Sequence, residues 1–374
     1  MHTGVDGVIQ VIIGIVGIAL IALTLWEAFE TIILPRRVNR QLRFTRIFYR
    51  STWRAWRAAA RRIRRRETWL SIYGPLSLLV LLALWAVGLV FGFALVHWGL
   101  GSHVYADGNA RGFGTDLYMS GTTFFTLGLG DVTPHTGLAR FVTVLEGGTG
   151  FGFLGLVITY LPVIYQAFSR REVQINLLDA RCGSPPCGAE LLRRIGRCER
   201  GGTTLADDLT PILEVWEQWC AELLESSFSY PALTYFRSQH ENQSWIAALT
   251  AIMDACVLLL STVEGASEWR TRITFGIARH TAVDIAQYIG ATPFRPVPDR
   301  LPPAEYAALI ALLQTNGLTL KQGTDTEARL AALRFLYEPF IVGLAERLEF
   351  TIPAWLPVPD AKDNWETTAW DNVL

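Results

Sequence analysis

The sequence predicts an all-α membrane protein with three transmembrane helices, a re-entrant segment between the second and the third, and an α-helical cytoplasmic domain. Three observations lead to this fold class. Of the 374 residues, 51% are hydrophobic and 18% are charged, whereas soluble domains carry about 25% charge. Three apolar runs reach the length of about 20 residues that crosses a bilayer. The net charge of −1 is a cancellation between unequal blocks, because the basic residues concentrate in one short segment.

Residues 1–34 are expected to form the first transmembrane helix. The apolar run covers roughly residues 8–34, and no Lys or Arg precedes it. A signal peptide begins with basic residues and has a shorter apolar core. The segment is therefore predicted to be a retained span rather than a cleaved signal.

Residues 35–68 are predicted to form an Arg-rich amphipathic helix. Thirteen Arg stand against the single acid Glu67, a net charge of +12 over residues 35–67. A voltage sensor also uses repeated Arg, but this segment has too little apolar length to span, and no four-helix sensor precedes it. We expect a helix at the cytoplasmic membrane surface that holds anionic lipid headgroups. The expected lipid-facing stripe consists of Arg43, Arg46, Arg50, Arg54, Arg57, Arg61 and Arg64.

These Arg residues also set the predicted topology. Basic residues collect in cytoplasmic loops, so the loop after the first span lies inside and the N-terminus lies outside. The second span, roughly residues 69–98, then runs outward, and the third, roughly residues 141–168, runs back. Residues 169–374 carry a net charge of −8 and are placed in the cytoplasm. The protein is thus predicted to be a multi-pass protein of the plasma (inner) membrane.

Residues 112–137 do not have the composition of a solvent loop. They are too apolar for one and too short for another span. A short helix over residues 116–125, followed by an extended piece with alternate glycines, fits a re-entrant segment, because irregular backbone at membrane depth needs protein or a water-filled cavity around it. Alternate glycines let successive carbonyl groups point the same way and replace the hydration shell of a cation. This piece is Thr126, Leu127, Gly128, Leu129, Gly130 and Asp131.

These six residues resemble the selectivity filter of the potassium-channel pore family, whose pattern is T-x-G-(Y/F/L)-G-D, and we call them the filter segment. The resemblance is to the prokaryotic two-helix type and covers roughly residues 75–168, within a pore unit assigned to residues 69–168. Leu129 stands where the family most often has Tyr or Phe, as in the second pore loops of some two-pore-domain channels. The resemblance implies that K⁺ is coordinated at Thr126, Leu127, Gly128 and Leu129.

Further roles follow from extending this resemblance along the third span. A carboxylate at membrane depth is costly and marks a functional candidate, and Glu146 is expected near the level of the filter. We expect it to brace the filter through hydrogen bonds from Thr122 or Thr123; a carboxylate facing a crevice and direct ion coordination are the alternatives. Gly150 matches the family's hinge glycine, with tight packing against the pore helix as the alternative. The residues expected to face the ion pathway and its gate are Phe151, Leu154, Ile158 and Pro162.

Residues 169–374 are expected to form a helical domain. One helix is predicted to start at Thr210, and another to cover residues 268–289. The apolar segment 242–261 is interpreted as a buried core helix rather than a fourth span, because its flanks are polar and it contains Asp254. Pro302 and Pro303 are predicted to open a further helix. The last helix is predicted to begin at residue 325 and to bend at residue 339.

Several classes of function lack support in the sequence. Five Cys, an odd number, argue against a disulfide framework. We find no catalytic triad and no nucleotide-binding fingerprint after the third span, so we predict no enzymatic activity, no cofactor apart from the transported K⁺, and no nucleic-acid partner. His280 and Asp284 lie four residues apart and could share a metal ion, but this spacing alone does not make a site. The sequence does not identify a cytoplasmic ligand or protein partner.

The resemblance implies passive conduction of K⁺ through a homotetrameric pore, because one re-entrant segment per chain cannot close a ring. Two alternatives remain open. Leu129 motivates a weakly selective monovalent cation channel. A membrane-anchored helical signalling protein with a non-conducting pore is the other alternative.

Overall fold

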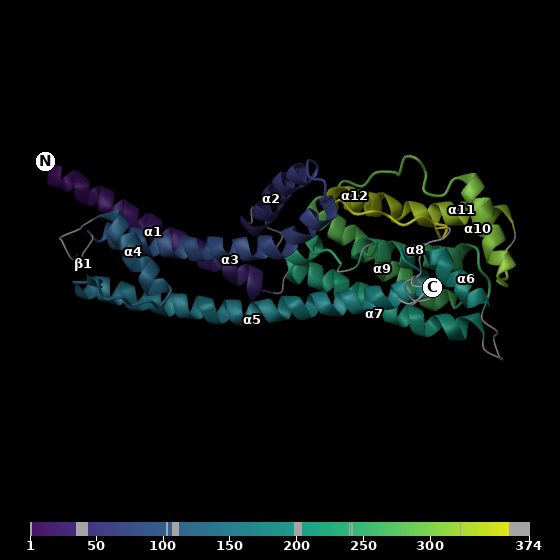
Figure 1. The fold of residues 1–374 in the computed structure, drawn as a ribbon, viewed down its shortest axis with the longest axis horizontal. Coiled ribbons are helices and arrows are strands. Elements are labelled where there is room, and N and C mark those ends of the chain that lie inside the picture. The colour runs from purple at the N-terminus through teal and green to yellow at the C-terminus, as the bar shows by residue number, and fades with distance from the viewer. Residues whose placement is uncertain are drawn as a thin grey trace, which may run out of the picture. The chain divides into compact units, whose positions relative to one another are not determined.

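The computed structural model describes residues 2–34, 44–101, 104–106, 112–197, 204–238, 240, 242–321 and 323–358. In these parts of the chain almost all regular structure is helical, which confirms the predicted all-α class (Figure 1). Two short strands, β1 (Val104–Ala106) and β2 (Val132–Pro134), pair antiparallel. The chain divides into two compact units, Met1–Tyr165 and Gln166–Leu374.

Three helices among the described residues are long and apolar enough to cross a membrane, as predicted. They are α1 (His2–Ile32), α3 (Arg66–Gly99) and α5 (Gly137–Cys182). The third is longer than its predicted apolar length, because α5 continues without a break into the second unit (Figure 1). Apolar length therefore located the spans, while the end of α5 depends on its packing in the second unit, where Ile175 and Leu178 are buried.

Glycines bring α1 and α3 into close backbone contact. A Cβ added at Gly99 would lie 2.5 Å from the Gly14 nitrogen, and one at Gly17 would lie 2.7 Å from the Gly92 oxygen. Small residues permit this approach between helices in a membrane. Much of the remaining surface of α1 is exposed and apolar, as at Val11 and Ile15, which suits contact with lipid tails.

Replacing Gly99 with Ala is expected to separate α1 from α3. The added methyl group overlaps the backbone of Gly14, which cannot move aside as a flexible side chain can. Such overpacking costs about 1–3 kcal/mol, and the thermal midpoint of the purified protein in detergent should fall. The control is Gly7→Ala on α1, where an added Cβ meets nothing within 4 Å. Equal midpoints for the two variants would contradict the close crossing.

Helix α2 (Phe44–Ala60) separates basic from aromatic side chains. Phe48, Tyr49 and Trp53 are buried. The Trp53 ring lies 4.8 Å from that of Tyr73, and Trp56 stacks on Trp69 at 4.4 Å. Since Tyr73 and Trp69 belong to α3, the aromatic side of α2 is anchored on protein.

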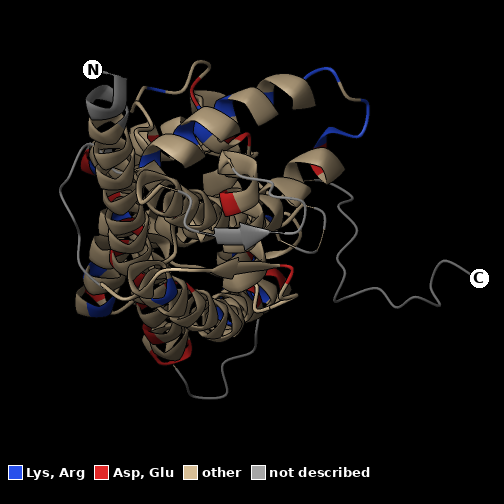
Figure 2. Ribbon diagram, turned by 90° about the vertical axis from the view of Figure 1, so that its left-hand side faces the viewer, with Lys and Arg blue, Asp and Glu red and all other residues tan. Residues whose placement is uncertain are grey.

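Helix α2 carries fewer of the predicted stripe of Arg residues than expected, because it ends at Ala60. Four members of the stripe lie in α2, whereas Arg61 and Arg64 lie in the turn that follows it. Five Arg within residues 61–66 repel one another in a helix, and the turn lets α3 return along α2. Arg43 lies outside the described residues. Figure 2 shows the concentration of basic residues in α2 and in this turn.

The second unit is a helical bundle built around α8 (Trp245–Ser261). Every residue of α8 is buried, which confirms a core helix rather than a fourth span. The helices that pack against α8 are α6 (Gly188–Arg197), α9 (Glu268–Ile289), α11 (Thr324–Phe335) and α12 (Glu338–Leu348). Outside them lie α7 (Leu205–Ser229), the 3₁₀ helix η2 (Pro231–Tyr235) and α10 (Pro303–Thr315).

Helix boundaries in this unit were predicted with mixed success. The prediction of residues 268–289 matches α9, and the opening at Pro303 matches α10. The predicted start at Thr210 is wrong, because α7 begins after Thr204, whose capping box with Asp207 satisfies the first amide groups. The predicted single last helix is two helices, α11 and α12, since Pro339 lacks an amide donor and restricts the residue before it.

Candidate functional site

The predicted re-entrant helix is α4 (Phe113–Phe124), which packs against α3. It begins three residues earlier than predicted and has twelve residues, too few to cross a bilayer. Asp116, Met119, Ser120 and Phe124 form its buried side. The filter segment follows directly and leads into β2.

The backbone of the filter segment alternates in conformation. Thr126, Gly128 and Gly130 have φ values of +59°, +57° and +80°, whereas the φ values of Leu127 and Leu129 are not positive. A positive φ is unusual for a β-branched residue such as Thr126, and backbone strain of this kind clusters at functional sites. The alternation is typical of a strand whose successive carbonyl groups line one side.

The Thr126 end of the segment is hydrogen-bonded to the helix that precedes it. The Leu127 amide donates to the Thr122 carbonyl at 2.7 Å, and the Thr126 amide donates to the Thr123 carbonyl at 3.0 Å. Within one chain the other side of the segment is uncovered, since Leu127 and Leu129 are each 63% exposed. The Leu129 side chain therefore does not pack behind the segment within this chain.

The Asp131 end of the segment is held by a contact that was not predicted from the sequence. The Tyr118 hydroxyl donates to a carboxylate oxygen of Asp131 at 2.8 Å. Tyr118 lies on α4, thirteen residues before Asp131, so the bond joins the pore helix to the end of the filter segment. A tyrosine in a re-entrant helix was the available signal, but its partner could not be read from spacing.

The buried Glu146 has a partner other than those predicted. One of its carboxylate oxygens lies 3.5 Å from Nε2 of His97, on α3, and both side chains are fully buried. The Thr122 hydroxyl donates to the Met119 carbonyl at 2.9 Å instead. The sequence analysis did not single out His97, although a lone histidine in an otherwise uncharged span was visible.

Gly150 lies directly against the end of the pore helix. A Cβ added there would lie 2.1 Å from the Phe124 carbonyl oxygen, which supports the tight-packing alternative. α5 continues through both Gly150 and Pro162. The residues expected along the ion pathway are uncovered within the single chain: Phe151 is 72% exposed, and Leu154, Ile158 and Pro162 are also exposed.

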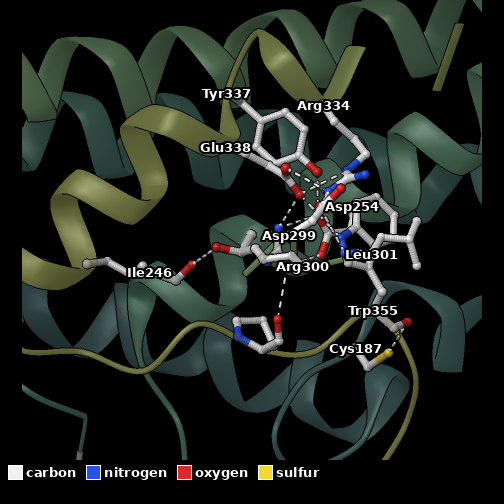
Figure 3. Close-up of polar contacts among 12 residues, drawn as sticks. Cys187, Ile246, Asp254, Asp299, Arg300, Leu301, Arg334, Tyr337, Glu338 and Trp355 are labelled. Carbon is white, nitrogen blue, oxygen red and sulfur yellow. Dashed lines mark hydrogen bonds and ion pairs between the residues drawn. The ribbon is translucent and has the colours of Figure 1, made fainter. Parts of the chain in front are cut away.

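The second unit contains a buried group of charges that we call the ion cluster (Figure 3). Arg300 pairs with Asp254 and with Glu338, each at 2.8 Å, and Arg334 pairs with Glu338 at 3.0 Å. The Tyr337 hydroxyl donates to Asp254. In the sequence, Asp254 indicated only that α8 is not a fourth span, and its charged partners were not predicted.

The ion cluster joins segments that are distant in sequence. Arg300 also donates to the Pro353 carbonyl at 2.9 Å, and the Trp355 indole donates to Glu338 at 3.3 Å. Burial by itself would lower the pKa of Arg300, but the charges and hydrogen bond of Asp254, Tyr337 and Glu338 together outweigh it and the pKa is raised. Burial raises the pKa of Glu338 against the opposing effect of Arg300 and Arg334. These contacts link α8, α12 and the segment 353–355, and we call this linkage a clasp.

The predicted pair His280 and Asp284 does form a contact, with 3.3 Å between Nε2 and a carboxylate oxygen. Among the described residues, no group of three or more His, Cys, Asp or Glu is arranged to hold a metal ion. The pair is therefore a local contact along α9.

Comparison with known proteins identifies the class of the first unit. Residues 79–166 match the family described as "Ion channel", and the match runs from α3 through α4 and the filter segment into α5. This segment is similar to the ion-channel family, which confirms the resemblance found in the sequence.

A second comparison found a bacterial relative of part of the chain. Over 106 residues the chain is 29% identical to "Uncharacterized membrane protein YdjJ" of Bacillus subtilis (strain 168). The match covers 28% of this chain and 31% of that protein, so the chain spans about a third of the length of this relative. No solved structure matches the chain. The chain thus has three helices long and apolar enough to cross a membrane, and its residues 79–166 are similar to an ion-channel family.

Proposed function

We propose that this protein is a potassium-selective channel that conducts K⁺ passively down its electrochemical gradient. The observation that carries this proposal is the alternating backbone of the filter segment, with positive φ at Thr126, Gly128 and Gly130. Rings of carbonyl oxygens from such segments replace the hydration shell of K⁺. The bond from Tyr118 to Asp131 supports the outer end of this arrangement.

The pore is proposed to be a homotetramer. One chain supplies one filter segment, and a closed ring of identical subunits buries the same faces in each of them. The exposed residues Val144, Phe151 and Ile158 recur every seven positions along α5, a surface suited to the pore and to neighbouring copies. Near Ile158 and Pro162 an apolar constriction would gate by dewetting.

The orientation proposed from the sequence places α2 at the cytoplasmic membrane surface. Arg46, Arg50, Arg54 and Arg57 would bind anionic headgroups there, while the aromatic side of α2 stays anchored on α3. The N-terminus would lie outside, and the second unit would lie in the cytoplasm. The family match suits a transport protein rather than an enzyme.

A weakly selective monovalent cation channel is the second candidate function. The observation that favours it is Leu129, whose side chain is exposed and has no hydrogen-bonding group to stiffen the filter.

Reversal potentials of the protein in planar bilayers test both candidates. With K⁺ on one side and an equal total concentration of Na⁺ on the other, we expect reversal far from zero, toward the K⁺ equilibrium potential. In K⁺ gradients the reversal potential should move by about 59 mV for each tenfold change, the value for a single charge. Reversal near zero in the mixed-cation arrangement would support the weakly selective channel, and no current at any voltage would contradict both.

A further inference from the structure

A buried polar group lies behind the pore helix, at the meeting of three helices. His97 comes from α3, Ser120 from α4 and Glu146 from α5. Their exposed fractions are 1%, 0% and 0%. His97 Nε2, both Glu146 carboxylate oxygens and the Ser120 hydroxyl lack a hydrogen bond of ordinary length within the described structure, although His97 and Glu146 are 3.5 Å apart.

Burying His97 and Glu146 costs free energy unless the pair is electrically neutral, so its cost depends on how many protons the two side chains hold. A buried charge without a partner costs several kcal/mol, and ionisable residues within membrane spans are functional candidates for that reason. The imidazole and the carboxylate together are neutral when they hold one transferable proton between them. A second proton leaves His97 positive beside an uncharged Glu146.

The group is connected mechanically to the filter segment. Ser120 lies on α4 six residues before Thr126, and Glu146 lies one helical turn before Gly150 on α5. At Gly150 the helix α5 is in direct contact with the Phe124 carbonyl, at the end of α4 from which the filter segment leaves. A displacement of α5 at Glu146 is therefore transmitted to the base of the filter.

Among the described residues, few other titratable groups face this site. Asp116 lies one turn before Ser120 on the same buried side of α4. Asp131 is held by Tyr118 at the exposed outer end of the filter segment. α1, which packs on α3, has no Asp, Glu, Lys, Arg or His over residues 7–26.

We propose that His97 and Glu146 form a proton-controlled brace behind the filter. While the pair holds one proton, the brace keeps the filter in its conducting conformation. When acid adds a second proton, the contact between His97 and Glu146 weakens and the filter stops conducting. This inference rests on the proposed channel function. Both are positioning residues, because they act through α4 and α5 and do not touch the ion. The second proton removes the charge that attracts His97 to Glu146 and leaves a positive charge behind the cation pathway.

The test measures K⁺ flux of the full-length protein in liposomes, with equal pH on both sides, between about pH 4 and pH 8, the range that spans the ordinary pKa values of Glu and His. We expect the flux to fall by up to about tenfold for each pH unit below the midpoint, as for one added proton. The double variant His97→Gln/Glu146→Gln keeps volume and hydrogen-bonding capacity without a titratable group. It should conduct, and its flux should not depend on pH.

Two single variants serve as matched controls. His135→Gln removes an exposed histidine that follows the filter segment, and Asp116→Asn removes the nearby buried acid. Both should keep the wild-type pH profile. A conducting double variant with the wild-type profile, or a control that flattens the profile by itself, would overturn the proposal.

A second readout does not depend on conduction. Infrared difference spectra between neutral and acid pH should show the carbonyl band of a protonated buried carboxyl group. The band should disappear in Glu146→Gln and shift in His97→Gln. If the wild type conducts no ions but shows these changes, the channel function fails and the proton-binding pair stands; if it conducts and the band is unaffected in both variants, the pair is overturned.

Discussion

Replacing Gly128 with Ala is expected to abolish K⁺ flux while leaving the helical fold intact. Gly128 has a φ of +57°, and an added Cβ would meet nothing within 4 Å, so the protomer has room for a methyl group. The effect is conformational, because an L-residue in the left-handed region costs roughly 1–2 kcal/mol. In a ring of identical subunits this conformational cost recurs in every subunit. If the alanine leaves the left-handed region to relieve the cost, the adjacent carbonyl group turns away from the proposed ion pathway.

The measurement is flux through reconstituted liposomes, normalised to the amount of protein inserted, with circular dichroism as the check on folding. Gly130→Ala should behave alike, because Gly130 has a φ of +80°. The control is Gly114→Ala, since Gly114 lies within α4 with open space around it and no positive φ. Wild-type flux in Gly128→Ala would show that the filter segment does not line the conduction pathway.

Replacing Arg300 with Ala is expected to destabilise the second unit by about 3–5 kcal/mol, the usual cost of removing one partner of a buried ion pair. The substitution leaves the buried carboxylates of Asp254 and Glu338 without their shared cation. It also releases the Pro353 carbonyl, so the C-terminal segment should detach first. Hydrogen exchange of the full-length protein, followed by mass spectrometry, reports the protection of α8 and of residues 353–358.

The matched control is Arg272→Ala. Arg272 pairs with Glu268 at 2.7 Å on an exposed surface of α9, where such pairs contribute about 0–1 kcal/mol. If the two variants lose equal protection, the ion cluster is not a clasp.

The loss of stability of the second unit caused by Arg300→Ala should be larger near neutral pH than in mild acid. Burial already raises the pKa of Glu338, and removal of the cation should raise it further. A carboxyl group whose folded pKa exceeds its unfolded pKa lowers stability as pH rises through that interval. The difference between variant and wild type should therefore be largest near neutral pH and shrink in mild acid. A difference that grows on acidification would contradict this assignment.

Much of the fold was predictable because its signals are local. The spans follow from apolar length. The predicted bounds of α9 match the structure, in which Ser267 caps its start and Gly290, with a φ of +70°, ends it. The start of α7 failed through an overlooked local signal, since Thr204 and Asp207 form a capping box that spacing alone reveals.

The contacts around the candidate site were not predictable in this way. The bond from Tyr118 to Asp131 spans thirteen positions, and the pair of His97 and Glu146 joins two different spans. The sequence analysis marked Glu146 as costly but assigned it nearer partners, Thr122 and Thr123. Periodicity places a residue on a helix face, yet it does not say which face of which other helix lies opposite.

The sequence by itself determined the number of helices long and apolar enough to span a membrane, the helical character of the second unit and the place of the glycine-alternating segment after α4, because apolar length and glycine spacing act within a few residues of one another. Only the tertiary structure decided what Glu146 contacts, why Gly150 must be small, and how Arg300 holds two carboxylates 46 and 38 positions away. The physical reason is that a buried charge has to be compensated wherever the chain brings a partner within hydrogen-bonding distance, and that distance is set by the packing of whole helices.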